Sequence, residues 1–210
     1  MVKTVENFEL TFRISLKEWG YTVRSKKENT KALIVDSFKK LMTQHSFDKI
    51  TIKMITDEAK LIRPSFYNHF ADKYELLEWI CYKDIFEGAT LLIDNKMFNE
   101  TILFVLTRIE NNKEFYIKAM KIEGQNSFES IIYKFLLKMF EELFSVLDIE
   151  NMNFEGILTA SEIANYYSRG LTYFLITWLK KGVQVPAHEL AEKYYLLLSN
   201  SLEDIVFKPL

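Results

Sequence analysis

The chain has 210 residues, of which 49% are hydrophobic and 15% aromatic. That apolar content excludes a disordered or fibrous chain. With six glycines and three prolines, the chain lacks the turn roughly every 8–12 residues that a β-sandwich or barrel requires. The net charge is −2, but residues 1–70 hold 13 Lys or Arg against 8 Asp or Glu, and residues 71–210 hold 14 against 21. A basic amino-terminal part followed by an acidic remainder leaves a nucleic-acid partner open.

Three bulk features indicate a cytoplasmic protein. Cys81 is the single cysteine, so an internal disulfide is excluded and a reducing compartment is favoured. Charged residues interrupt the first 13 positions, which therefore do not resemble a signal peptide. The best candidate for a membrane span, at 171–179, has about half of the roughly 18–20 apolar residues needed, so no membrane partner is expected.

Apolar residues spaced by three and four predict an all-α protein throughout. Thr51 and Asp72 are expected to cap helices, and Pro64 and Pro186 fit first helical turns. Gly182 is expected to end a helix. The expected helices cover about 29–45, 51–59, 63–70, 72–91, 99–109, 112–122, 127–147, 153–181 and 186–206.

Segment 51–77 combines two short expected helices, a tight connection and the start of a longer helix. This is the arrangement of a helix-turn-helix, in which the second helix lies in the major groove of DNA. The second helix, at 63–70, contains no acidic residue and is rich in hydrogen-bonding side chains. The alternative is a helical hairpin inside an all-α enzyme, with its aromatic residues in the core.

The side chains of this second helix suit the chemistry of DNA. Arg63 can bind guanine in a bidentate manner, Asn68 can pair with adenine, and Pro64 can contact a thymine methyl group. Phosphate contacts position a protein on DNA without specifying sequence. The side chains with the reach and chemistry for phosphates are Ser65, Tyr67 and Lys73.

A longer motif runs through the same segment. It comprises Thr51, Ala59, Phe66-Tyr67-Asn68-His69-Phe70, Lys73 and Leu76-Leu77. This pattern, over about 28–77, resembles the amino-terminal DNA-binding domain of the TetR family of bacterial transcriptional regulators. The resemblance implies an extension (1–28), a three-helix helix-turn-helix domain (29–77) and a larger helical ligand-binding and dimerisation domain (78–210). The DNA contacts that it implies are Thr51, Lys53, Arg63, Pro64, Ser65, Tyr67, Asn68 and His69, with Lys73 on a phosphate.

Three positions depart from the usual pattern of the family. Lys60 stands where a glycine usually takes the left-handed conformation, which costs a lysine on the order of 1 kcal/mol. Ile62 replaces the usual capping serine, and Thr56 replaces a usual alanine. No DNA-contacting group is lost. The departures nevertheless leave open a second interpretation, a helical ligand-binding or protein-interaction module that no longer binds DNA.

Residues 1–28 fit two structures. Apolar residues from Phe8 to Leu16 alternate as in a strand, whereas Phe8, Phe12 and Leu16 also recur as on a helix. A helix is favoured, because a lone strand would have no partner elsewhere in the sequence. This extension could contact DNA through Arg24 and the two following lysines, or pack on the neighbouring domain.

Residues 166–198 are similar to the carboxy-terminal end of a TetR subgroup that includes dihydroxyacetone-kinase operon regulators. The family resemblance implies that the last two long helices pair with those of a second subunit. The first of these helices carries more apolar residues than one buried face needs; a large monomeric core is the alternative. The expected dimer contacts are Ile157, Ile163, Tyr167, Leu171, Leu175, Trp178, Tyr195 and Leu198.

The resemblance also implies a small-molecule effector that moves the helix beginning at Asp72. Aromatic and Met side chains suit an adaptable apolar cavity, although at helical spacing they more often form plain core. Arg169 could meet an anionic ligand, but a surface ion pair is the commoner role. The candidate ligand contacts are Trp79, Tyr82, Phe86, Phe104, Phe115, Tyr116, Met120, Phe135, Met139, Arg169 and Tyr173.

No catalytic site, metal or cofactor is expected. His45, His69 and His188 are scattered, and the sequence holds no His-Glu-x-x-His motif and no phosphate-binding glycine loop. Cys81 is expected to be a small buried hydrophobic residue. The sequence therefore predicts a homodimeric regulator that binds a palindromic DNA operator under the control of a small molecule.

Overall fold

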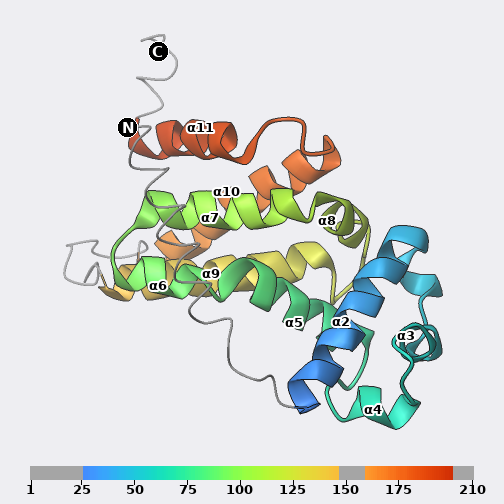
Figure 1. Ribbon diagram of the computed structural model, residues 1–210. Helices are drawn as coiled ribbons and strands as arrows, with labels where there is room; N and C mark the ends of the chain where they lie inside the picture. Colours follow the sequence, from blue (N-terminus) through green and yellow to red (C-terminus); the bar gives the residue numbers. More distant parts are fainter. Residues whose placement is uncertain (1–25, 147–158, 201–210) are drawn as a thin grey trace, which may run out of the picture.

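A computed structural model describes residues 26–146 and 159–200 (Figure 1). Within these ranges every regular element is a helix and none is a strand, which confirms the predicted all-α class. The elements are α2 (Lys26–Gln44), η2 (Phe47–Lys49), α3 (Ile52–Glu58), α4 (Arg63–Tyr67), α5 (Lys73–Cys81), η3 (Tyr82–Phe86), α6 (Ala89–Asp94), α7 (Phe98–Asn111), α8 (Lys113–Ala119), α9 (Phe128–Val146), α10 (Ala160–Lys180) and α11 (Ala187–Ser199). The predictions for 1–25, 147–158 and 201–206 lie outside the described residues.

Helices α2, α3 and α4 form the amino-terminal group, in blue and teal at the right of Figure 1. Phe38, Ile55 and Phe66, one from each helix, are fully buried. The short turn η2 adds Phe47, whose ring meets that of Phe38 edge-on with the centroids 6.2 Å apart. These side chains give each helix one fixed side and leave its other side to solvent.

Helices α5 to α11 form the remainder, called the body below. Within it α10 packs along α9 and α11 packs on α7, while α2 of the amino-terminal group packs against α8. The buried side chains form one contiguous cluster that extends from Ile34 to Tyr194. The predicted domain boundary at residue 77 falls inside α5, where Leu76, Leu77 and Ile80 are all buried. None of the helices in the described ranges is long and apolar enough to cross a membrane.

The helix predicted over 72–91 is interrupted by a π-helical turn, η3. There the N–H of Glu87 donates to the carbonyl of Tyr82, five residues earlier, at 2.9 Å. The chain then passes Gly88, where a Cβ atom would lie 2.5 Å from the ring of Phe104 on α7. Glycine is therefore required for α7 to approach this closely.

Helix α10 ends at Lys180, and Gly182 follows its last turn as the predicted stop. Gly182 has a φ of 75°, a conformation that glycine adopts without strain. Its N–H donates to the carbonyl of Leu179 at 2.9 Å, and the N–H of Val183 donates to that of Trp178 at 3.0 Å. These bonds satisfy carbonyls that the end of a helix otherwise leaves unpaired.

Alkaline pH is expected to destabilise this fold. Burial raises the pKa of the Cys81 thiol above its ordinary 9.0, and raises the pKa of the Tyr116 and Tyr194 hydroxyls above 10.0. Once pH passes 9, the unfolded chain releases protons that the folded chain retains, so the free energy of unfolding falls. Burial also lowers the pKa of Lys73, which partly offsets the loss. We expect a net fall of about 1–2 kcal/mol between pH 8 and 10, measured by urea denaturation.

A Cys81→Ala chain is the control for this pH dependence. It removes the thiol, which is buried in the folded chain. In the unfolded chain this thiol loses its proton at a lower pH than the two tyrosines do. The fall between pH 8 and 10 should then shrink by about 1.4 kcal/mol. An unchanged fall would show that the thiol does not stay protonated in the folded chain.

Candidate nucleic-acid interface

Helix α4 has one apolar side and one polar side. Phe66 is fully buried, and its ring centroid lies 5.8 Å from that of Phe70. The opposite side reaches solvent, with Tyr67 51% exposed. Of the predicted contacts on this segment, Arg63, Pro64, Tyr67 and Asn68 are exposed, and Ser65 and His69 are half-buried. Four of these six side chains thus reach solvent around the exposed side of α4.

Helix α3 presents two more predicted contacts at its start. The Thr51 hydroxyl accepts from the N–H of Met54 at 3.2 Å, which confirms the predicted cap. Lys53 is exposed and pairs with Asp57 one turn later at 3.2 Å. An exposed pair of this kind contributes only about 0.3–0.5 kcal/mol. The Lys53 ammonium is thus available for a phosphate.

The turn between α3 and α4 has the backbone geometry that the family pattern implies, although it lacks the glycine. Lys60 has a φ of 54°. Its N–H donates to the carbonyl of Asp57 at 3.2 Å, and the N–H of Leu61 donates to that of Thr56 at 2.8 Å. These two bonds form a Schellman motif with Lys60 in the left-handed position. The predicted departure is therefore a local strain in an intact turn.

Replacing Lys60 with glycine is expected to raise the free energy of unfolding by up to about 1 kcal/mol. The gain comes from relief of the left-handed strain, since a glycine has no Cβ. Lys53→Gly is the matched control, because the same change inside α3 should instead destabilise by about 1 kcal/mol. Urea denaturation measures both. If Lys60→Gly lowered the free energy of unfolding as much as Lys53→Gly does, Lys60 would not be strained.

The other two departures are also visible. Ile62 is the N-cap residue of α4 and makes no side-chain hydrogen bond, so the serine-type cap that is usual in the family is absent, as predicted. Thr56 is buried, and its hydroxyl donates to the carbonyl of Lys53 at 3.1 Å. Neither residue disturbs the exposed side of α4.

Lys73 has a role in the structure that differs from the predicted phosphate contact. Its ammonium donates to the carbonyls of Phe47 at 2.8 Å, Ile50 at 3.0 Å and, at the limit, Asp48 at 3.4 Å. It also lies 4.3 Å from the centroid of the Phe47 ring. A lysine has three donors, and these carbonyls use all of them. Lys73 therefore ties the start of α5 to the turn that leads into α3.

The first amides of α5 are occupied as well. The Asp72 carboxylate accepts from the N–H groups of Tyr74 at 2.8 Å and Glu75 at 2.9 Å. Glu75 in turn accepts from the N–H of Ala71 at 2.5 Å. This arrangement is close to a capping box and confirms the predicted helix start. It also leaves those amides bound to protein rather than open to a phosphate.

Two family models match this chain. Residues 34–80 match bacterial regulatory proteins of the tetR family, and residues 97–200 match the transcriptional regulator C-terminal region. The chain belongs to the TetR family of transcriptional regulators. The first match covers the helix-turn-helix, and the second covers α7 to α11.

Individual relatives agree with this family. The HTH-type dhaKLM operon transcriptional activator DhaS of Lactococcus lactis subsp. lactis (strain IL1403) is 33% identical over 97 residues, which are 45% of this chain and 50% of that relative. The match thus spans half of the relative's length. A structure of the dihydroxyacetone kinase operon activator DhaS superposes with a TM-score of 0.56 and 24% identity, over 80% of this chain and 93% of that one.

A second structural neighbour is NalD, the secondary repressor of the MexAB-OprM multidrug efflux pump in Pseudomonas aeruginosa. It superposes with a TM-score of 0.58 and 15% identity, over 83% of this chain and 96% of that one. At these identities the two structures establish a shared TetR fold.

In the described part of this TetR chain the predicted ligand contacts are spread over several places. Phe135 packs between Tyr82 and Phe86, with ring centroids 5.7 and 4.9 Å away. The ammonium of Lys31 lies over the ring of Trp79, 4.2 Å from the centroid of that ring. The remaining candidates are scattered: Phe115, Tyr116 and Met139 are buried, Phe104 and Met120 half-buried, and Arg169 and Tyr173 exposed.

Two surface clefts lie near these residues without being lined by most of them. One, of about 200 Å³, lies between the starts of α5 and α9, and the other, of about 380 Å³, lies between α2 and the α7–α8 junction. Phe115 is the one predicted ligand contact that lines either of these two clefts. Arg169 donates to the side-chain oxygen of Asn165 at 2.8 Å and lies 4.8 Å from the ring centroid of Tyr133. Among the described residues its partners are thus an amide and a ring.

Three predicted dimer contacts belong to the core of the chain itself. Leu171, Leu175 and Trp178 are buried within α10, and the indole N–H of Trp178 donates to the carbonyl of Val185 at 2.8 Å. Because these three side chains already pack inside one chain, they present little surface to a second copy. Of the other candidates, Tyr195 is exposed, Ile163, Tyr167 and Leu198 are half-buried, and Ile157 lies outside the described residues.

Other apolar side chains, which the sequence interpretation did not assign to the dimer interface, do reach solvent. Tyr166 and Tyr173 on α10 are 74% and 68% exposed. They are seven residues apart, and this spacing places them on the same side of a helix. The same periodicity could have separated them from the buried set. On α11, exposed apolar residues include Leu196 and Leu197.

Proposed function

We propose that this protein regulates transcription by inserting the exposed side of α4 into the major groove of an operator. The two-sided packing of α4 carries the proposal. Phe66 holds one side in the core, while Arg63, Tyr67 and Asn68 extend from the other. A recognition helix needs this combination, because side chains on a fixed helix can select among bases.

The proposed contacts divide into two kinds. Arg63 binds guanine, Asn68 pairs with adenine, and Pro64 contacts a thymine methyl group. The remaining contacts hold phosphates and so position the helix. These positioning residues are Thr51, Lys53, Ser65, Tyr67 and His69. Lys73 acts one step away, by holding the turn before α3 through its three carbonyl contacts.

The proposed regulator is a homodimer on a palindromic operator. The exposed face of α10 with Tyr166 and Tyr173 supports this, together with the exposed Tyr195 on α11. Apolar surface of this kind is stabilised when a second copy covers it. A two-fold dimer would present two α4 helices to two half-sites about one turn of DNA apart.

A small-molecule effector is proposed to act on the body next to α5. Tyr82 and Phe86 directly follow α5, and the ring of Phe135 on α9 packs against both, which supports this location. Displacing these rings would move α5 and thereby change the spacing of the two α4 helices. Such a regulator works on the chromosome, so the proposal places the protein in the cytoplasm. It requires no catalytic residue, cofactor or membrane partner.

The test is an electrophoretic mobility shift with the DNA that flanks the gene of this protein. A shuffled fragment of the same length serves as the control. We expect selective binding that weakens steeply as salt rises, because each phosphate contact releases a counterion. Sedimentation of the complex measures whether two chains bind each fragment.

A chain that dimerises but does not retain the flanking fragment above the shuffled one would overturn the proposal. It would favour instead a ligand-binding or protein-interaction module of the same fold. Binding by one chain to each fragment would overturn only the homodimer. Selective binding that does not change with salt would contradict the assigned phosphate contacts.

A further inference from the structure

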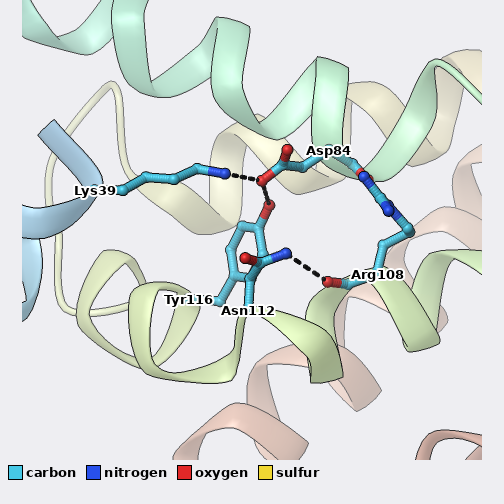
Figure 2. A network of polar contacts seen from close by, with 5 residues as sticks. All are labelled: Lys39, Asp84, Arg108, Asn112 and Tyr116. Carbon is cyan, nitrogen blue, oxygen red and sulfur yellow. Dashed lines mark hydrogen bonds and ion pairs between the residues drawn. The ribbon is translucent and has the colours of Figure 1, made fainter. Parts of the chain in front are cut away.

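Figure 2 shows a group of polar side chains at the junction of α2 with the body. The Asp84 carboxylate accepts from the ammonium of Lys39 and, at 3.2 Å, from the hydroxyl of Tyr116. The backbone carbonyl of Asp84 accepts from Nε of Arg108 at 2.5 Å, and the carbonyl of Arg108 accepts from the side chain of Asn112 at 3.4 Å. These five residues are called the Asp84 cluster. They join α2 to η3, α7 and the start of α8.

The Asp84 cluster is shielded from solvent. The side chains of Lys39 and Asp84 are 24% and 18% exposed, and Tyr116 is fully buried. The neighbouring pair of Lys83 and Glu87 is more exposed and lies within a single turn of the chain. A shielded charge that loses its partner is strongly destabilising, whereas an exposed pair contributes little. Rotation of α2 away from η3 would therefore deprive the shielded Asp84 carboxylate of its lysine partner at a considerable cost.

The position of Asp84 in η3 makes this contact sensitive to the conformation of the body. A π-helical turn holds one residue more than an α-helical turn, is rare, and occurs often at functional sites. Conversion of η3 to α-helix would rotate the residues on one side of it by about 100° relative to the other. Asp84 would then leave Lys39 and Tyr116. The π turn and the cluster thus depend on each other.

An aromatic contact lies beside the cluster on the same junction. The rings of Phe38 on α2 and Phe115 on α8 meet edge-on, with centroids 6.3 Å apart. The Lys39 ammonium lies 5.8 Å from the Phe115 centroid. Apolar contacts are non-directional, whereas hydrogen bonds weaken steeply away from a straight geometry. The rings therefore hold α2 against α8, and the Asp84 cluster fixes the direction in which α2 points.

We propose that Asp84 is a positioning residue that fixes the angle of α2, and with it α3 and α4, relative to the body. A change in η3 releases that angle. The consequence for operator binding rests on the proposed function, because the angle of α2 determines where α4 meets the groove. The structural claim concerns the chain alone and is tested without DNA.

The experiment measures distances between two nitroxide labels by pulsed electron paramagnetic resonance. The labels are placed at Lys49→Cys in η2 and His188→Cys in α11, two positions whose native side chains are exposed. The buried native Cys81 remains in place. Labelled chains are diluted with unlabelled chains, so that distances within one chain dominate.

Three variants are compared in this labelled background. Asp84→Asn keeps the shape of the side chain and removes its charge, and Lys39→Met removes the ammonium from the other side of the junction. Glu87→Gln is the matched control, because it breaks an ion pair on the same π turn that does not reach α2. Circular dichroism establishes that each variant is folded.

We expect Asp84→Asn and Lys39→Met to broaden the distance distribution at least about twofold, and Glu87→Gln to leave it unchanged. A chain carrying both Asp84→Asn and Lys39→Met should have a distance distribution no broader than that of the broader single variant, because both changes break the same bond. A wild-type width in folded Asp84→Asn and Lys39→Met chains would overturn the proposal. If Asp84→Asn does not fold, Lys39→Met and Tyr116→Phe decide in the same way.

The outcome is distinguishable from a failure of the proposed function. If the chain binds no DNA but its distance distribution broadens on Asp84→Asn substitution, the proposed regulator is contradicted and the positioning role is supported. If the chain binds its flanking DNA but both single variants keep the wild-type distribution, the positioning role is contradicted and the regulator is supported.

Discussion

A chain carrying both Arg63→Ala and Tyr67→Ala is expected to bind its flanking DNA at least about 100-fold more weakly than the unchanged chain. Both side chains are exposed on α4. Loss of a bidentate contact between a guanidinium and guanine costs about 1–3 kcal/mol, and loss of the Tyr67 contact adds to this. A homodimer would lose each contact twice. Mobility shifts at one fixed salt concentration measure the change.

The control for this double variant is Lys138→Ala on α9. Lys138 is exposed and paired with Glu142 one turn away, so its removal subtracts a positive charge at a distance from α4. We expect Lys138→Ala to bind DNA as the unchanged chain does. Undiminished binding by the double variant, with both proteins folded, would mean that α4 does not make the proposed contacts.

Replacing Lys73 with methionine is expected to lower the free energy of unfolding by about 2 kcal/mol. The change keeps the length of the side chain and removes the ammonium that bonds the carbonyls of Phe47 and Ile50. Hydrogen bonds from a charged donor are stronger than neutral ones, and part of their contribution is offset by the burial that lowers the Lys73 pKa. Urea denaturation near neutral pH measures the loss.

Lys53→Met separates the two roles that a lysine can have in this region. Lys53 is exposed and makes one ion pair within α3, so its loss should change stability by less than about 0.5 kcal/mol. Under the proposed function, Lys53→Met instead lowers the affinity for DNA, because a phosphate contact is lost. The opposite result, a stable Lys73→Met chain with weakened DNA binding, would return Lys73 to the predicted phosphate contact.

The helix-turn-helix was predictable because its signals are local. Thr51 and Asp72 accept backbone bonds from residues two or three positions ahead, and such caps can be recognised from short sequence spacings. The conformation of Lys60 followed from a single position in the family pattern. The exposed side of α4 followed from the absence of acidic residues in segment 63–70 and from its hydrogen-bonding side chains.

Contacts between distant residues could not be predicted in this way. Lys73 reaches back 26 positions to Phe47, and Asp84 reaches 45 positions to Lys39. Helical periodicity also does not detect a π turn, because one extra residue only shifts the phase of the pattern. The positioning role of Asp84 therefore became visible only with the packing of α2 against α8.

The surface of α10 that is left for a partner could not be predicted, for a related reason. Helix α10 is apolar on more than one side, so the sequence could not tell which side its own chain covers. The structure buries Leu171 and Leu175 against the body, while Tyr166 and Tyr173 stay exposed. Composition measures how much apolar surface a helix has, and the tertiary packing decides which part of it remains for a partner.

The single contiguous core from Ile34 to Tyr194 has a consequence for how the molecule melts. Helices that share one core unfold together, so we expect one cooperative transition in place of separate steps for α2–α4 and the body. A fragment ending at residue 77 would lose the half of α5 that contributes Ile80 and would not be an autonomous domain. Any molecule that binds the folded body therefore also stabilises α4 by mass action.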